Sequence, residues 1–358
     1  MTGDARAALR DAVDARQARS NANALVQDAS GTLADRHSGY AAQERRAGTP
    51  WRLNALLFAA TVGSVFLMGA LAAGWIPRAS LDSAAEVARL GASYALPLLA
   101  ILLFHEFGHY IAARHHGVPA SLPYFIPMPL LSLFGTLGAV IVMPRRIRSA
   151  RALLDIGAAG PLAGMLVAVP IILYGLSLSE VQPQTDGHYV QEGQSLLYLA
   201  LKYVVHGHIP AGHDVFLHPT AFAGWTGFLV TFINLIPFGQ LDGGHVAYAL
   251  LGPRHHGLAR LLLHLPLALA VYNLAAFAGV GWWRAESGEQ FDVFDALSSG
   301  SVGMWLVLWG LLHVMKRASG AQHPPVDDEE LGPTRRFVAI LTLALFGLLF
   351  MPSPLVVY

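Results

Sequence analysis

The feature that most constrains this chain is a series of apolar segments, each approaching the length needed to cross a lipid bilayer. A spanning helix needs about 17–25 mostly apolar residues. Seven segments approach this length, near residues 53–75, 92–114, 152–176, 222–250, 258–281, 302–315 and 337–356. Only 13% of the residues are charged, against about 25% in a typical soluble domain. We therefore predict an all-α polytopic membrane protein with about seven transmembrane helices.

The positions of lysine and arginine orient these predicted spans, because cytoplasmic loops carry an excess of both residues. With the N-terminus inside, the inner segments 1–52, 114–151, 252–260 and 316–336 hold eight, five, two and four of them. The outer segments hold only Arg78, Arg89, Lys202 and Arg284. This bias supports seven spans with the C-terminus outside.

Three regions follow from this pattern. Residues 1–50 form a polar tail without the apolar core of a signal peptide, and we expect it on the cytoplasmic side. Residues 51–250 hold the first span and the residues with recognisable chemistry, and residues 251–358 add further transmembrane helices.

Composition excludes several functions. The net charge is zero, so bulk electrostatics give no reason to expect a nucleic-acid partner. The chain has no cysteine, which excludes disulfides and thiolate nucleophiles. A metal site would therefore have to use histidine, aspartate or glutamate.

The second predicted span carries the sequence His105-Glu106-Phe107-Gly108-His109. Residues i and i+4 lie on the same face of a helix, so the two histidines can bind one metal ion. Glu106 lies beside them, where it can polarise a metal-bound water, as in the H-E-x-x-H pattern. The alternative is two core histidines and an accidental glutamate. Ionisable side chains within a membrane span are costly, however, and mark function by default.

A zinc ion held by two histidines needs a third protein ligand and an open position for water. The fourth predicted span provides Asp242, followed by Gly243 and Gly244. On the predicted orientation, the second and fourth spans both run from outside to inside. His109 and Asp242 lie about five and about eight residues from the inner ends, a difference in depth of about 5 Å at 1.5 Å per residue. We therefore predict that His105, His109 and Asp242 meet.

Asn234 precedes Asp242 by eight residues. Its amide can donate to a developing oxyanion or to a neighbouring helix, and the sequence favours neither role. Pro237 lies between them and can serve simply to break the span so that Asp242 reaches inward.

Two connections between spans carry further signals. Residues 117–150 are apolar but contain five prolines, and residues 135–143 (GTLGAVIVM) are rich in β-branched residues. This pattern predicts an extended or hairpin element that dips into the membrane. The outer segment 177–220 contains histidines that could bind a metal, although their irregular spacing is more typical of a solvated loop: His188, His206, His208, His213 and His218.

On these residues the chain resembles the site-2 proteases, a family of intramembrane zinc metalloproteases. The family pattern is H-E-x-x-H in one span and N-x-x-P-x-x-x-x-D-G in a later one, and both are matched without substitution. Residues 151–164 (RALLDIGAAGPLAG) are similar to the family's kinked middle core helix. Together with the preceding loop, they are similar to the branch of plant chloroplasts and cyanobacteria, which lacks a PDZ domain. The resemblance covers residues 92–250.

The resemblance implies a three-helix catalytic core in which His105, His109 and Asp242 bind Zn²⁺. Glu106 would be the general base and Asn234 would lie close to the site. Residues 119–143 would form a membrane-embedded β-hairpin-like loop that aligns the substrate.

The implied function is an endopeptidase that cleaves transmembrane or membrane-anchored proteins near the cytoplasmic side of the bilayer. One alternative is a catalytically silent scaffold or chaperone on the same fold. Another is an ion transporter, which is disfavoured because the two halves show no paired, similarly interrupted spans. The expected partners are a transmembrane protein substrate and membrane lipid. The Ala/Arg-rich composition, with no Ser-rich leader, favours a bacterial cytoplasmic (inner) membrane.

Overall fold

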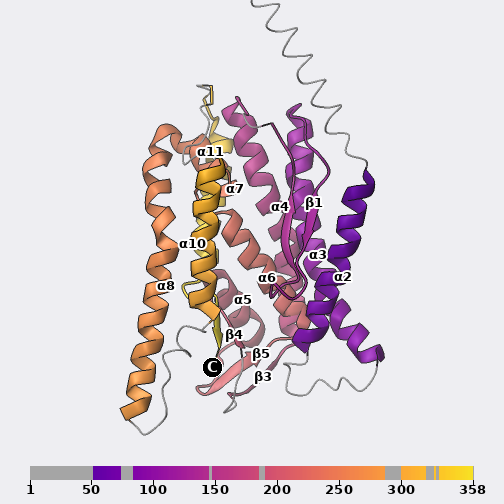
Figure 1. Cartoon of the computed structure of the whole chain (residues 1–358), viewed down its shortest axis with the longest axis vertical. Coiled ribbons are helices and arrows are strands. Elements are labelled where there is room, and N and C mark those ends of the chain that lie inside the picture. Colours follow the sequence, from indigo (N-terminus) through magenta and orange to yellow (C-terminus); the bar gives the residue numbers. More distant parts are fainter. Residues whose placement is uncertain are drawn as a thin grey trace, which may run out of the picture. The chain divides into compact units, whose positions relative to one another are not determined.

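The structure, a computed structural model, describes residues 51–73, 84–144, 147–184, 190–286, 300–319, 326–327 and 330–357. The predicted polar tail, residues 1–50, lies outside the described residues. The described part is mostly helical, as the sequence predicts (Figure 1). The helices are α2 (Trp51–Ala73), α3 (Ala84–His115), α4 (Ala150–Ser177), α5 (Leu196–His206), α6 (Pro219–Asn234), α7 (Asp242–Leu251), α8 (His255–Glu286), α10 (Gly300–Ser319) and α11 (Pro333–Leu349).

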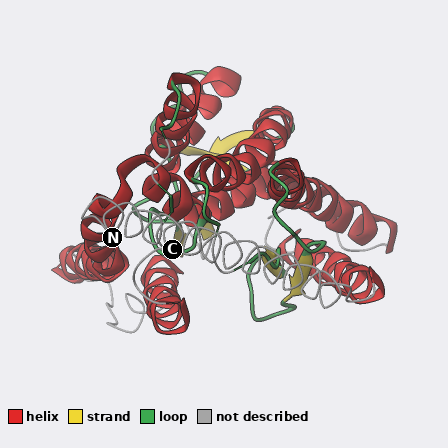
Figure 2. Cartoon of the chain, turned by 90° about the horizontal axis from the view of Figure 1, so that it is seen from above, coloured by secondary structure: helices red, strands yellow, loops and turns green. Residues whose placement is uncertain are grey.

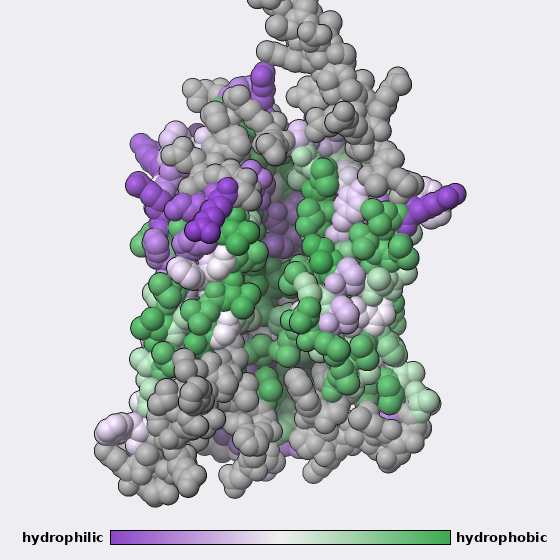
Figure 3. Space-filling view, in the orientation of Figure 1, coloured by the Kyte–Doolittle hydropathy of each residue, from purple (hydrophilic) through white to green (hydrophobic). Residues whose placement is uncertain are grey.

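Four described stretches are long and apolar enough to cross a membrane: Trp51–Leu71, Ala84–His115, Ala150–Ser177 and Asp242–Gly279. They coincide with the first, second, third and fifth predicted spans, and the last stretch also includes α7, which is the end of the predicted fourth span. Seen from above, the long helices run side by side (Figure 2). On the face shown in Figure 3, apolar side chains cover the middle and hydrophilic side chains gather toward one end. The described part therefore has the apolar helices of a membrane protein.

The fourth predicted span, residues 222–250, is not one helix. Helix α6 ends at Asn234, residues 235–241 form consecutive turns, and α7 begins at Asp242. Pro237 has no N–H to continue a helix, and Gly239 has a φ of 55°, in the left-handed region that glycine adopts easily. The two short helices follow one another along the bundle (Figure 1). The sequence grouped residues 222–250 as one span that Pro237 could break, and the structure has this break over residues 235–241.

Helix α4 lies at the centre of the fold and contacts α3, α5, α6, α7 and α11. Helix α6 contributes three of the largest buried side chains to the main core. Trp225, Phe228 and Phe232 are at most 2% exposed, and their spacing of three and four residues places them on one face of the helix. Phe232 also packs edge to face against Trp305 of α10. Helix α6 is thus fixed between α4 and the C-terminal helices.

The described residues also contain three two-stranded antiparallel sheets, so the chain is mostly but not entirely α-helical. The sheets pair β1 (Tyr124–Pro127) with β2 (Thr136–Val140), β3 (Glu180–Pro183) with β5 (His213–Phe216), and β4 (Val190–Glu192) with β6 (Leu355–Val357). The last two were not predicted, because strands of three or four residues are too short to show a clear alternating pattern. Strands β3, β4 and β5, with α5, form a cap, which we define as the described residues 178–184 and 190–218.

The cap has a buried polar centre on α5. The ammonium of Lys202, 4% exposed, donates to Glu192 at 3.0 Å and to Asp214 at 3.4 Å. The hydroxyl of Tyr198 donates to the same Glu192 oxygen at 2.8 Å. Burial and the nearby Glu192 carboxylate raise the pKa of Tyr198 well above its usual range, so Tyr198 stays a protonated donor. Each charge in this centre therefore has a partner.

Removing the cation from this centre should destabilise the cap. Lys202→Met leaves Glu192 and Asp214 without their cation, and breaking a buried pair in this way costs about 3–5 kcal/mol. We expect a clearly lower thermal unfolding midpoint in detergent. As a control, Arg89→Met breaks an exposed pair with Glu86 and should leave the midpoint nearly unchanged, because exposed pairs contribute little. Equal midpoints for the two variants would contradict this assignment.

Candidate metal centre

The site begins with an unusually close contact between α3 and α4. A Cβ added to Gly108 on α3 would overlap the carbonyl of Ala159 on α4 and come within 3.0 Å of the Ala163 side chain. Small residues allow helix backbones in a membrane to approach closely. Gly108, the fourth residue of the H-E-x-x-H pattern, therefore lets the histidine-bearing helix lie directly against α4.

His109 lies in a recess of α4. A Cβ on Gly160 would overlap the His109 ring, including Nε2. The His109 Nδ1 lies 2.7 Å from the carbonyl of Ile156. A carbonyl can only accept, so Nδ1 carries the proton and Nε2 presents a lone pair to the site. Neither Gly160 nor Ile156 was a predicted site residue. Backbone carbonyls leave no mark in a sequence, and the space that Gly160 leaves shows only once α3 lies against α4.

Asp242 reaches the site at the first residue of α7. Gly243 and Gly244 follow it, and a Cβ on either would meet the backbone of the preceding turn, including the carbonyls of Leu235 and Phe238. The two glycines therefore let the first turn of α7 fold back on residues 235–239. This close packing fixes where the carboxylate of Asp242 lies.

The structure brings three of the predicted residues together. The distances His105 Nε2–His109 Nε2, His105 Nε2–Asp242 Oδ2 and His109 Nε2–Asp242 Oδ2 are each 3.2 Å. The three ligand atoms form an equilateral triangle, built by two helices that are 137 residues apart in sequence at this point. Both histidines are buried, and the Asp242 side chain is 17% exposed.

This donor set fits a zinc-type ion. A tetrahedral ion with ligands at about 2.0–2.1 Å separates neighbouring ligand atoms by about 3.3 Å, close to the observed spacing. Three lone-pair atoms at this distance repel one another unless a cation or a proton lies between them. In the neutral ring, the Nδ1–H of His109 bonds to Ile156, so the Nε2 lone pair faces the other two atoms and suits a cation between them. The residues present therefore fit a divalent metal ion with an open position.

Two further predicted residues border the triangle. Glu106 is buried, at 6% exposed, and interacts electrostatically with His109 and Asp242. Asn234, the last residue of α6, has its side-chain nitrogen 3.4 Å from His105 Nε2. The geometry thus places a carboxylate and an amide beside the three ligand atoms.

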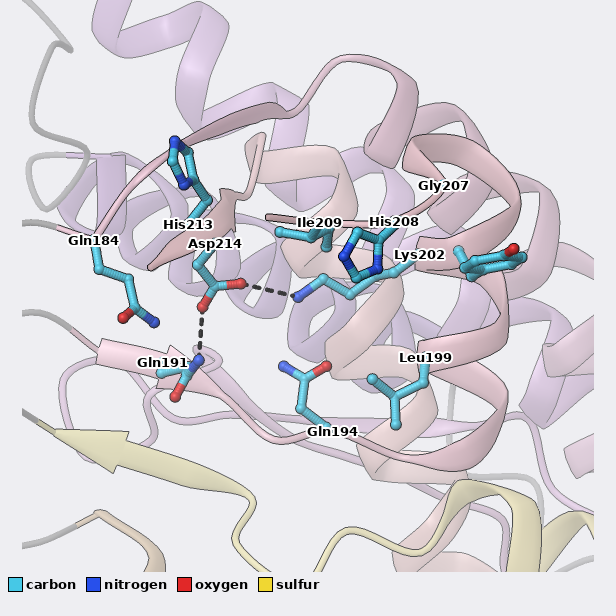
Figure 4. Close-up of a pocket in the computed structure, with 11 residues that line it drawn as sticks. Gln184, Gln191, Gln194, Leu199, Lys202, Gly207, His208, Ile209, His213 and Asp214 are labelled. Atoms are coloured by element: carbon cyan, nitrogen blue, oxygen red, sulfur yellow. Dashed lines mark hydrogen bonds and ion pairs between the residues drawn. The ribbon is translucent and has the colours of Figure 1, made fainter. Parts of the chain in front are cut away.

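The cap histidines do not form a second centre. Among the described residues, the one group of three side chains with metal-binding geometry is His105, His109 and Asp242. His188 lies outside the described residues, and His218 accepts a bond from the backbone N–H of Thr220 at the start of α6. The cap instead has a pocket that Asp214, Lys202 and Gln191 help to line (Figure 4). In it, Asp214 pairs with Lys202 and accepts a hydrogen bond from Gln191 at 2.6 Å.

Comparison with known proteins supports this description. The sequence model of Peptidase family M50 matches residues 93–272. This range includes the triangle, Glu106 and Asn234. No solved structure matches the chain.

Several curated plant proteins are similar to the chain. The "Probable zinc metalloprotease EGY2, chloroplastic" of Oryza sativa subsp. indica is 30% identical over 240 residues, or 63% of this chain and 43% of that protein. EGY1 of Arabidopsis thaliana, also named a probable chloroplastic zinc metalloprotease, is 37% identical over 169 residues, or 44% of this chain and 30% of that protein. EGY3 of Oryza sativa subsp. indica is 27% identical over 329 residues, or 84% of this chain and 48% of that protein. The chain thus spans less than half the length of each relative.

The recess for His109 can be tested by filling it. Gly160→Ala places a methyl group where the imidazole lies, so His109 must move away from the other two ligand atoms. We expect metal affinity to fall at least about tenfold, as when the support of a metal-binding histidine is lost. The metal content of the purified, dialysed protein measures this. Gly310→Ala on α10 is the matched control, because a Cβ there meets nothing within 4 Å. Equal metal content in both variants would contradict the recess.

Proposed function

The chain belongs to Peptidase family M50, and from this membership we propose that it is an intramembrane zinc endopeptidase. The single observation that carries the proposal is the triangle of His105, His109 and Asp242, with sides of 3.2 Å. The names of its relatives, which include "zinc metalloprotease", support zinc as the ion. We propose that all three residues are its ligands.

Glu106 is the proposed general base. When bound, zinc lowers the pKa of its water to about 7 and polarises the scissile carbonyl. Glu106 accepts a proton from the attacking water and returns it to the leaving amine. No hydrogen bond engages its carboxylate among the described residues, so both oxygens are free for this exchange.

Asn234 is proposed to orient the substrate. Its amide nitrogen is at the rim of the triangle, 3.4 Å from His105 Nε2. When His105 Nε2 is a metal ligand, its lone pair is occupied and cannot accept a hydrogen bond from the Asn234 amide. Its N–H groups are then available for the carbonyl of a bound peptide or for the oxyanion that forms during hydrolysis.

The proposed substrate is a transmembrane or membrane-anchored protein, cut near the cytoplasmic side. The proposed topology has seven spans with the N-terminus inside, in which α6 and α7 together make the fourth span and α10 and α11 the last two. A substrate helix has its carbonyls paired, so it must unwind before hydrolysis. The β1–β2 hairpin is proposed to lie within the membrane, where it can hold the unwound segment as an added strand.

The chain's own membrane is proposed to be a bacterial cytoplasmic membrane, on the basis of its Ala- and Arg-rich composition. The relatives are named chloroplastic. Fractionation of the native host decides between these locations.

Glu106→Gln is the first test of the proposal. Glutamine keeps the shape of the side chain but cannot accept the proton, so cleavage of a reporter membrane protein should fall by about 10²–10⁴. Bound zinc should remain at the level of the unaltered protein, because residue 106 is not a ligand. Both quantities are measured on the purified protein in lipid vesicles.

The matched control is Glu86→Gln, the same substitution on the same helix but far from the triangle in sequence. It should cleave normally. Persistent cleavage by the Glu106 variant would exclude this site as the catalyst. Zinc bound without any cleavage by the unaltered protein would favour the silent scaffold, and the absence of zinc would favour the scaffold or the transporter.

Strand addition to the hairpin has its own test. Leu137 and Val140 on β2 are exposed, at 64% and 51%, and proline at either position removes a backbone N–H from the strand. We expect slower cleavage with unchanged zinc content. Alanine at the same positions keeps the N–H and should cleave at nearly the normal rate. Proline variants that match the alanine variants would count against strand addition.

A further inference from the structure

Helix α2 makes contacts that a simple membrane anchor does not need. Two polar residues of this mostly apolar helix, Asn54 and Ser64, are at most 9% exposed. Polar side chains within a membrane span are costly unless they are satisfied. Both make their hydrogen bonds to the β1–β2 hairpin and not to another helix.

Asn54 holds the open end of the hairpin. Its side-chain nitrogen donates to the carbonyls of Leu122 and Pro123, each at 3.0 Å. These are the two residues immediately before β1. One amide group therefore binds two successive backbone carbonyls, and the Ser121 hydroxyl also donates to that of Leu122.

Ser64 holds the other end. Its hydroxyl donates to the carbonyl of Gly135 at 2.5 Å, immediately before β2. Gly135 has a φ of 78°, and a Cβ there would come within 2.7 Å of the Val65 Cα. Glycine is thus required both by the backbone conformation and by the close approach of the turn to α2.

The spacing of the two contacts matches the hairpin. Ten residues of helix separate Asn54 from Ser64, about 15 Å. The strand from residue 123 to residue 128 covers about 16 Å. Between the two ends, Phe58 of α2 packs edge to face against Phe125 of β1 at 5.0 Å. The helix therefore contacts the hairpin at both ends and at one point between them.

The hairpin between these contacts is irregular. Phe125 pairs with Ala139 and Pro127 with Thr136, so two residues of β2 oppose one residue of β1. Such a bulge weakens pairing locally and re-aims side chains. The Thr136 hydroxyl bridges it, donating to Ile126 and accepting from the N–H of Gly138. A two-stranded ribbon is marginal by itself, so its register depends on external support.

Helix α2 is also fixed to the histidine-bearing helix. A Cβ on Gly69 would come within 2.7 Å of the Tyr94 side chain of α3, and a Cβ on Gly91 of α3 would come within 2.9 Å of the Phe66 ring. The glycines let the two helices pack closely at this level. Strand β2 also contacts α3 directly, so α2 and α3 together support the hairpin.

We propose that α2 is a splint that fixes the register of the hairpin relative to the metal centre, with Asn54 and Ser64 as positioning residues. The consequence for cleavage rests on the proposed function: if a substrate strand adds to the hairpin, the splint sets which peptide bond lies at the metal. Loosening the splint changes substrate binding and the choice of bond. It does not change the chemistry at the metal.

The test uses Ser64→Ala and Asn54→Leu, which each remove the donor at one end. Thr61→Val is the matched control. Thr61 is a fully buried residue of the same helix, and its hydroxyl bonds only within the helix, to Leu57. Ser64→Thr keeps the hydroxyl and should restore the behaviour of the unaltered protein.

The first readout does not depend on proteolysis. The chain has no cysteine, so spin labels can be attached at Leu131→Cys near the hairpin tip and Leu166→Cys on α4, which are 87% and 74% exposed. The two donor-removing variants should broaden the distance distribution between the labels, and Thr61→Val should not. Unchanged distributions in both donor-removing variants would overturn the proposal, whatever the cleavage result.

The second readout is cleavage of the reporter membrane protein. Loss of one buried hydrogen bond should raise KM by about fivefold, with kcat and zinc content nearly unchanged and with cuts spread to neighbouring bonds. A merely destabilised protein would lose kcat and zinc while cutting the same bond, which would contradict a positioning role. An unaltered protein that cleaves nothing would refute the proposed function. The distance measurement would then decide by itself whether α2 fixes the hairpin.

Discussion

The close contact between α3 and α4 is the constraint on which the rest of the site depends. Gly108 removes the side chain that would hold the helices apart, and Gly160 leaves the space that the His109 ring fills. At this distance the Ile156 carbonyl can accept from His109 Nδ1 and leave the Nε2 lone pair facing His105 and Asp242. A larger residue at either glycine would separate the helices or displace the ring. The backbones of α3 and α4 therefore set the orientation of the His109 ring.

The second requirement is a carboxylate delivered from a distant part of the chain. A continuous helix over residues 222–250 would carry Asn234 and Asp242 about 12 Å apart along its axis. The turns between α6 and α7 instead bring both to His105, at 3.4 Å and 3.2 Å. Pro237, Gly239 and the two glycines after Asp242 are what make this interruption possible. Irregular backbone at membrane depth is tolerated where it is buried in protein, and residues 235–238 are buried.

Much of this could be predicted from sequence because the signals were strong and local. The i, i+4 spacing of His105 and His109 is a helical pattern, and an acidic residue in an apolar segment is rare enough to be noticed. The charge bias of the loops set the direction of two spans, which was enough to predict that Asp242 and His109 lie at similar depth. The apolar helices followed from length and hydropathy alone.

The remainder depended on contacts that leave no periodic signal. The interruption after Asn234 was underestimated because hydropathy does not distinguish one long helix from two short ones. The strands of the cap, and the pairing of β6 with β4, are too short for their alternation to be read. The Ile156 carbonyl has no sequence signature, and the polar residues Asn54 and Ser64 could be interpreted only once the hairpin lay beside them.

The central claim is that two imidazole nitrogens and one carboxylate oxygen bind a single zinc ion. X-ray absorption at the zinc edge of the purified protein tests it most directly. The account predicts two histidine ligands and oxygen ligands at about 2.0–2.1 Å, with the carboxylate contribution lost in Asp242→Ala. A zinc shell without histidine scattering, or one unchanged by that substitution, would contradict it.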